Sequence, residues 1–253
     1  MGELINFKSQ TQELATLPVI CLDIETMSAS EEAINQELEL WKPPSNWKPE
    51  TIEKNREEHA QKVREKSALL DSAPIASIAL ADAEGDIVVF HQLRMDSGMQ
   101  DGFFSDHSKT EREMLIAFRE WANQCTDENT VIVGFNIGFD LPHLRLAYTR
   151  HNLKLPALLI PRSNNPVFDV MYLFTKYFTS KDTLFISLDE VAKRLGLDTD
   201  GKQLSGADVP KHIQQGFEDD NAVHLHTDVI TYNAIDVLLT MRAFLICTGQ
   251  SGD

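Results

Sequence analysis

The segment VICLDIET, residues 19–26, is an apolar run that carries two acidic side chains, Asp23 and Glu25. Its aliphatic and β-branched residues predict a buried strand. Burying an uncompensated carboxylate is expensive, and the segment contains no Lys or Arg. Because side chains alternate along a strand, both acids point the same way, while Leu22 and Ile24 point into the opposite layer. The pair therefore predicts a chelate for a cation.

Along the rest of the chain, apolar runs typical of strands are followed by segments in which apolar residues recur at helical spacing. Residues 83–85, Ala-Glu-Gly, separate the second and third apolar runs and predict a hairpin. Capping boxes at Thr110 with Glu113, and at Ser187 with Glu190, predict two helix starts. Strands are expected at 18–25, 74–81, 86–93 and 130–135, and helices from the first capping box to residue 125 and at about 140–151, 167–178, 187–195 and 222–246.

Residues 28–73 interrupt this plan between the first and second strands. They contain the Pro-rich WKPPSNWKP and then TIEKNREEHAQKVREKSALL, which has high helix propensity but few apolar positions. A charged helix on the surface, with one shallow inner face, is expected. With 42% hydrophobic residues in 253, the chain can bury a large core. We expect one α/β domain over residues 1–253, with this charged helical insertion after its first strand.

The net charge of −16 argues against general affinity for polyanions, because phosphate binding gains its energy from Lys and Arg. Residues 42–66 are the exception, with seven Lys or Arg against five Glu. They could guide a nucleic-acid strand or form a solvated helix face. The N-terminus lacks a basic flank before an apolar core, and no run approaches the roughly 20 apolar residues that span a bilayer. A soluble, cytoplasmic protein without a membrane partner is expected.

Two further acids occur where burial is expected. Asp140, in GFNIGFDLPHL, follows an apolar run and begins a helix, a position that the helix dipole also favours for an acid. Asp236, in ITYNAIDVLL, lies among apolar residues of the last helix, and Tyr232 four residues earlier shares its face. Four neighbouring carboxylates would repel one another unless divalent cations neutralised them. All-oxygen ligation suits Mg²⁺ or Mn²⁺.

Three motifs in order, D-x-E at residues 23–25, N-x-x-F-D at 136–140 and Y-x-x-x-D at 232–236, resemble the DEDD superfamily of 3′→5′ exonucleases in its tyrosine-bearing branch. That superfamily includes the proofreading domains of family A and family B DNA polymerases, and GFNIGFDLPHL is especially similar to the family B form. WKPPSNWKPETI and SLDEVAKRLGL also resemble stand-alone predicted exonucleases of phage and bacterial genomes. Thr231 occupies the histidine position of the other branch. The resemblance implies a ribonuclease H-like fold, a mixed sheet flanked by helices.

The resemblance also implies the roles of the acids. Asp23 would bridge two divalent cations, Mg²⁺ or Mn²⁺, while Glu25 and Asp236 complete the first site and Asp140 supports the second through water. Tyr232 would orient the attacking water, since its ordinary pKa near 10 favours orientation over proton removal.

The same resemblance implies a binding set for the substrate. Thr26 and Met27 would contact the terminal nucleotide, and Asn136 and Phe139 the penultimate one. For Met27 and Phe139 the alternative is core packing. Asp169 resembles an acid near the site in this branch but also suits a helix cap, so it stays outside the catalytic set.

The expected activity is metal-dependent hydrolysis of single-stranded DNA, or of frayed 3′ ends, to nucleoside 5′-monophosphates. An exonuclease of RNA or short oligonucleotides is the alternative within the class, because nothing in the motifs reads the 2′ position. A non-catalytic nucleic-acid-binding or scaffold module of a replication or repair complex is the alternative of another class. That alternative predicts the loss of a metal ligand, and all four acids and the tyrosine are present.

Overall fold

The fold is organised around one mixed β-sheet. The computed structural model describes residues 17–100, 102–127, 129–161, 167–179 and 185–250. The strands are β1 (Val19–Thr26), β2 (Ile75–Asp82), β3 (Ile87–His91), β4 (Gly98–Gln100), β5 (Phe103–His107), β6 (Val131–Gly134) and β7 (Val167–Asp169). They form one seven-stranded sheet in the order β4-β5-β3-β2-β1-β6-β7. β1 is an interior strand, antiparallel to β2 and parallel to β6.

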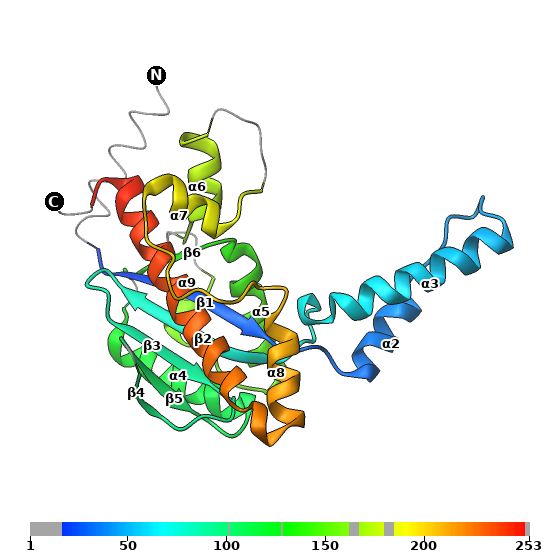
Figure 1. Cartoon of the computed structure of the whole chain (residues 1–253), viewed down its shortest axis with the longest axis horizontal. Coiled ribbons are helices and arrows are strands. Elements are labelled where there is room, and N and C mark those ends of the chain that lie inside the picture. Colours follow the sequence, from blue (N-terminus) through cyan, green and yellow to red (C-terminus); the bar gives the residue numbers. More distant parts are fainter. Residues whose placement is uncertain (1–16, 101, 128, 162–166, 180–184, 251–253) are drawn as a thin grey trace.

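Helices cover both faces of this sheet (Figure 1). They are α2 (Glu31–Leu40), α3 (Pro49–Glu65), α4 (Glu111–Cys125), α5 (Ile137–Arg150), α6 (Val170–Tyr177), α7 (Leu188–Leu195), α8 (Val209–Glu218) and α9 (His224–Thr248), with short 3₁₀ turns at Ser67–Leu69, Ala157–Leu159 and Asp220–Ala222. The long helix α9 lies along one face, across β1, β2, β3 and β6, and α4 and α5 lie on the other. The predicted α/β class with a mixed sheet flanked by helices is confirmed.

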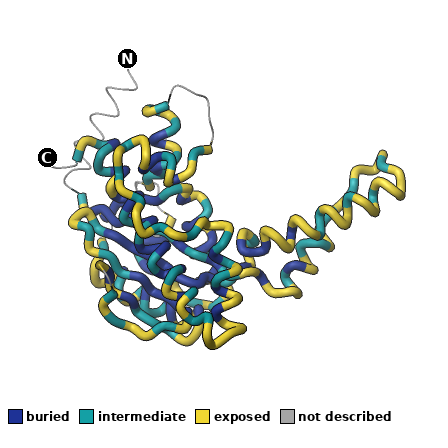
Figure 2. The backbone as a smooth tube through the Cα atoms, viewed as in Figure 1, coloured by how far each residue is buried: buried dark blue, intermediate teal, exposed yellow. Residues whose placement is uncertain are grey.

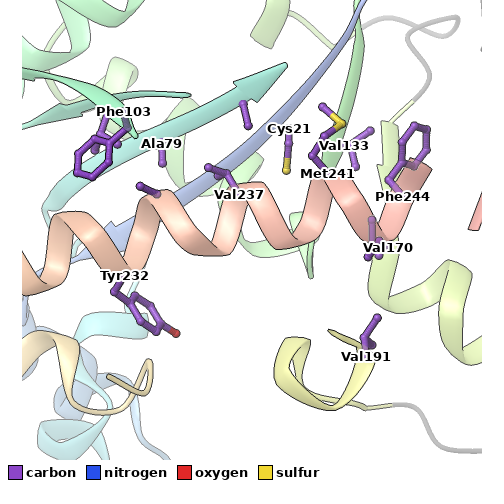
Figure 3. Packing of buried hydrophobic residues seen from close by; sticks show 14 of the residues in the cluster. Cys21, Ala79, Phe103, Val133, Val170, Val191, Tyr232, Val237, Met241 and Phe244 are labelled. Carbon is purple, nitrogen blue, oxygen red and sulfur yellow. The ribbon is translucent and has the colours of Figure 1, made fainter. Parts of the chain in front are cut away.

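The sheet divides the hydrophobic core into two layers, and the alternation predicted for β1 is confirmed. Cys21 packs in the layer under α9, whereas Leu22 and Ile24 pack in the layer of α4 and α5. In the α9 layer, Val237 and Met241 project from the helix toward the sheet (Figure 3). The side chains at positions 23 and 25 therefore face α9.

Several local predictions are confirmed. β2 and β3 form the predicted antiparallel hairpin, and its turn residue Gly85 has φ of 92°, a conformation that favours glycine. Thr110 and Ser187 accept hydrogen bonds from the backbone N–H groups of Glu113 and Glu190, so both predicted helix starts are correct.

Two predicted helix boundaries are wrong. The helix expected from residue 167 begins at Val170, because the three preceding residues pair with β6 as the edge strand β7. The helix expected from residue 140 begins at Ile137, directly after Asn136 in the left-handed conformation. The sequence patterns also missed α2, α8, β4 and β5, of which the two strands have three and five residues.

The insertion forms a helical arm, defined here as α2 and α3, that projects away from the sheet (Figure 1). Most of its surface is exposed or half-buried, and burial concentrates near its base (Figure 2). There Ile34 and Val63 pack with Ala29 and Ala73. The predicted charged surface helix with one shallow inner face is thus confirmed for α3.

The last helix departs from one expectation. The segment Asp220–Thr248 is long and apolar enough to cross a membrane by length and composition, so the prediction that no run approaches such a span is wrong. Of its most apolar window, 67% is buried inside the structure, where α9 packs on the sheet. A buried core helix meets the same criterion, and core packing accounts for this composition.

Candidate functional site

Asp23 and Glu25 stand on the interior strand β1 and face α9. They lie opposite Ala79 and Ser77 of β2, and both acidic side chains are half-buried. The pairing register shifts between Glu25 and Thr26, so the strand is irregular where the site begins. The sequence-based prediction that both acids share one face of a buried strand is confirmed.

A buried amide holds one of these acids. Asn233 of α9 is fully buried, and its Nδ2 donates a hydrogen bond of 2.6 Å to Oδ2 of Asp23. Its Oδ1 accepts a hydrogen bond of 2.9 Å from the Ser77 hydroxyl. The amide turns its NH₂ group toward Asp23, which leaves its oxygen to accept from Ser77. Sequence reasoning missed Asn233, although it directly follows Tyr232.

Asp140 joins this group from the first turn of α5. The side chain is buried, and its Oδ1 accepts a hydrogen bond of 3.3 Å from the backbone N–H of Ile24, between the two acids of β1. Burial raises the pKa of Asp140 to about 8, although this hydrogen bond lowers it. The acid therefore occupies the site rather than serving only the helix dipole.

Tyr232 and Asp236 approach the same site from α9. Both are buried, at 7% and 9% exposure, and Tyr232 projects from the helix away from the sheet side that Val237 faces (Figure 3). Burial, and then the charges of Asp236, Glu25 and Asp23, raise the pKa of Tyr232 well above its ordinary value. The phenol is thus a protonated hydrogen-bond donor among carboxylates.

Lys202, in the loop between α7 and α8, is the second residue that sequence reasoning missed. Its Nζ lies 2.9 Å from Oδ1 of Asp236, 2.6 Å from Oδ1 of Asp189 and 4.9 Å from the centre of the Tyr232 ring. The side chain is only 7% exposed. Burial lowers its pKa most, but Asp236 and Asp189 together raise it above the ordinary value. No motif near Lys202 in the sequence predicts this contact.

The four carboxylates lie close enough to shift one another's pKa values by electrostatic repulsion. Burial is the first cause that raises the pKa of Asp23, Glu25 and Asp236. The charges of Asp140, Glu25 and Asp236 raise the pKa of Asp23 further. The charges of Asp236 and Asp140 likewise raise the pKa of Glu25. The fold therefore brings together all four acids that the sequence motifs predicted, and their ionisation is costly without added positive charge.

This donor set fits divalent cations by its chemistry. Oδ1 of Asp236 is buried and lies 2.9 Å from Nζ of Lys202, and the Tyr232 side chain also hydrogen-bonds to Asp236. As the side chains stand, no group of three or more His, Cys, Asp or Glu among the described residues is arranged to hold an ion. Carboxylate oxygens are the ligands that Mg²⁺ and Mn²⁺ prefer, and Lys202 would compete with a cation for this oxygen of Asp236.

The two predicted contacts at the end of β1 differ in their surroundings. Thr26 is buried, and its hydroxyl donates a hydrogen bond of 2.6 Å to the carbonyl of Ala68. Met27 is half-buried and lines a groove, while its backbone N–H donates to the carbonyl of Pro74 at 2.8 Å. Of the two side chains, only that of Met27 faces an open space here.

The second predicted pair lies at the start of α5. Asn136 is exposed, has φ of 60°, and donates its backbone N–H to Oδ1 of Asp169 at 3.1 Å. Phe139 is half-buried, packs against the α4 and α5 core layer, and contacts the His143 ring at 5.1 Å between centroids. Asp169 also accepts hydrogen bonds from the first turn of α6, which confirms its interpretation as a helix cap.

The comparison with protein families agrees with this fold. A family model described as RNase_H superfamily matches residues 76–244, more than half of the chain. The chain therefore belongs to the RNase H superfamily, and the predicted ribonuclease H-like fold is confirmed. Membership indicates a nuclease whose substrate is nucleic acid, and nucleases of this superfamily typically use divalent metal ions. The match begins after β1, so it does not include Asp23 or Glu25.

Among solved structures, the family B DNA polymerase from the hyperthermophilic archaeon Pyrobaculum calidifontis is similar to this chain, with a TM-score of 0.51 and 16% sequence identity. The similarity covers 91% of this chain and 24% of the polymerase, so this chain spans about a quarter of that protein's length. At this identity the likeness shows the fold alone. No curated protein matches the sequence.

Proposed function

We propose that this protein is a 3′→5′ exonuclease that uses two divalent cations, Mg²⁺ or Mn²⁺, to release nucleoside 5′-monophosphates from single-stranded DNA or frayed 3′ ends. One observation carries the proposal. Asp23, Glu25, Asp140 and Asp236, which the sequence places in three separate motifs, interact in one site beside Tyr232. A non-catalytic module has no need to keep four costly acids together.

The chain's own residues have distinct tasks in this proposal. The four carboxylates would hold the cations, which when bound supply a nucleophilic water at neutral pH and stabilise charge on the phosphate oxygens. Asn233 keeps one oxygen of Asp23 fixed and leaves the other available. Tyr232, protonated at every working pH, donates its O–H and so orients the attacking water.

Two observations support DNA over RNA as the proposed substrate. The similar solved structure is a DNA polymerase, and its likeness extends over 91% of this chain. The tyrosine-bearing motif order also resembles polymerase proofreading domains. Neither observation distinguishes deoxyribose from ribose, so the substrate experiment also includes RNA.

The test is a digestion of 5′-labelled DNA and RNA of one sequence, each with a free or a blocked 3′ end. We expect the free DNA to shorten from its 3′ end in Mg²⁺ or Mn²⁺, with nucleoside 5′-monophosphates as products. Ca²⁺ should support little turnover because its larger, more flexible coordination spoils the two-ion geometry. Full activity in excess chelator, or equal cutting of blocked ends, would contradict the proposal.

The chain contains its own matched control for this test. Asp82 and Glu84 repeat the D-x-E pattern, but at the β2–β3 turn, where Glu84 is exposed and Asp82 binds the backbone of the turn. Glu25→Ala should remove nearly all activity, whereas Glu84→Ala should retain it. Equal losses in both variants would show that Glu25 acts through general surface charge and not within the site.

A further inference from the structure

A groove lies beside the end of β1, between the base of the helical arm and α8. Its volume is about 450 Å³, within the range of small-molecule sites. Met27, Ala29 and Ile34 line it on the side of β1 and the arm, and Ile213 and Phe217 line it on the side of α8. One of its lining residues, Met27, follows Glu25 of the site by two positions at the end of β1.

The lining of this groove suits a flat apolar ring better than a phosphate. The cation at its edge, Arg64, is already bound to both carboxylate oxygens of Glu31, at 2.8 and 2.6 Å. Another acid, Glu218, stands at the α8 edge. No unpaired positive charge among the described lining residues faces the groove. In a chain of net charge −16, a groove without a free cation among its described lining residues gains little from phosphate pairing, so its contribution to binding comes from apolar contacts.

Phe217 provides the aromatic surface in this groove. Phe217 is 43% exposed, and its ring makes a T-shaped contact with the buried His226 ring at 4.6 Å between centroids. Nε2 of His226 bonds the carbonyl of Ile213, and Nδ1 accepts the backbone N–H of Arg94, so this support is fixed. A ring held in place and half open is ready to stack on a base with little loss of side-chain entropy.

We propose that this groove binds unpaired nucleobases of the substrate strand, upstream of the nucleotide that is cleaved, with Phe217 as the stacking surface. The inference rests on the proposed function for the identity of the ligand and adds how the strand is held. Base stacking accepts every base, so binding should tolerate any sequence. It also requires the bases in the groove to be unpaired, which restricts the substrate to single strands and frayed ends.

The test is equilibrium binding, measured by fluorescence anisotropy in chelator at low salt, so that no turnover is needed. The probes are a 5′-fluorescein oligothymidylate and a set of oligomers of the same length, each with an abasic site at one position from the 3′ end. We expect Phe217→Ala to weaken binding of the full oligomer about 5- to 100-fold, as loss of one stacked base does. An abasic site at the position that meets Phe217 should weaken wild-type binding similarly, and Phe217→Ala should then weaken it no further.

Two companion variants protect the test against misfolding. Phe217→Leu keeps an apolar side chain against His226 and should still lose most of the stacking. Phe178→Ala is the matched control, since Phe178 is 45% exposed, stacks on Phe174, and directly follows α6, away from the groove. It should bind like wild type.

Failure of this inference and failure of the proposed function give different results. If the protein digests DNA but Phe217→Ala binds every probe as wild type does, the groove is not a base site. If wild type binds full and abasic oligomers equally, or binds neither, the inference is also overturned. If Phe217→Ala loses binding but no variant digests any substrate, the groove assignment stands and the exonuclease proposal fails.

Discussion

Lys202 forms a buried ion pair with Asp236, 2.9 Å between Nζ and Oδ1, at the acid that the sequence motifs place in the metal set. Removing one partner of a buried pair leaves the other uncompensated, which usually costs about 3 to 5 kcal/mol. Lys202→Met should therefore lower the melting temperature in chelator, and added Mn²⁺ should recover more stability in this variant than in wild type. Thermal melts with and without Mn²⁺ measure both effects.

The exposed Lys193 on α7 gives the control for that prediction. Lys193→Met should melt like wild type under both conditions. An equally small change in melting temperature for Lys202→Met would show that solvent already stabilises the Asp236 carboxylate. The lysine would then contribute no stability to the site.

The second prediction concerns the amide that holds Asp23. Asn233→Leu keeps the volume of the side chain but removes the donor to Oδ2 of Asp23 and the acceptor of the Ser77 hydroxyl. Loss of a partner that orients a metal ligand typically costs 10- to 100-fold in metal affinity or activity. We expect a matching rightward shift in the Mn²⁺ titration by calorimetry, and a smaller shift for Ser77→Ala. Unchanged Mn²⁺ affinity in both variants would contradict the positioning role.

The third prediction separates the tyrosine from the proposed metal ligands. Tyr232→Phe keeps the ring in the core and removes only a hydroxyl that is protonated at working pH. Loss of a positioned acid–base group costs on the order of 10²- to 10⁴-fold in rate. Turnover should fall by such a factor while the Mn²⁺ concentration for half-maximal rate stays unchanged. Glu25→Gln should instead shift that concentration upward.

A metal titration of wild type and both variants on one 5′-labelled oligomer decides this prediction. Wild-type turnover in Tyr232→Phe would leave the ring as core packing. It would also remove the main reason for preferring the tyrosine-bearing branch.

The fourth prediction is a dependence of stability on pH that arises outside the site. His91 of β3 is fully buried beside His107 of β5, with 5.3 Å between ring centres, and His226 lies in the same region. Burial, and then the charge of His107, lower the pKa of His91 to about 4 from 6.5. His91 is therefore protonated less readily in the folded state than in the unfolded chain. Stability from His91 is complete above about pH 6.5 and is lost as pH falls toward 4, by about 3 kcal/mol in total.

His91→Leu isolates this contribution from that of the carboxylates, whose raised pKa values act in the opposite direction. Denaturant unfolding of both proteins between pH 4 and 7, in steps, gives the difference in free energy of unfolding. The difference in free energy of unfolding between wild type and His91→Leu should fall with pH as the His91 contribution of about 3 kcal/mol is lost. A difference that stays constant over this range would show that the ring titrates equally in the folded and unfolded states.

The acids of the site could be predicted from the sequence because each has a local physical signature. Asp23 and Glu25 interrupt an apolar strand, and period-two alternation assigns them to one face. Asp236 interrupts an apolar helix, and the spacing of four joins it to Tyr232. These are short-range regularities, and the fold preserves them because burial of the flanking apolar side chains fixes which way the acids point.

The supporting residues could not be predicted in this way, because tertiary packing alone defines them. Lys202 belongs to a loop, 34 positions before Asp236, where no periodicity relates the two side chains. Asn233 makes its contacts across 210 and 156 residues. The same reason explains β7, three residues that become a strand only because β6 lies beside them.

The division of the site between β1 and α9 has a consequence for partial unfolding. Helix α9 contributes Tyr232, Asn233 and Asp236, while β1 contributes its acids more than 200 residues earlier. The acids therefore meet only while α9 packs on the sheet. An opening that releases α9 but leaves the β1–β2 pairing intact would separate the acids, so hydrogen exchange in α9 reports how often the site comes apart.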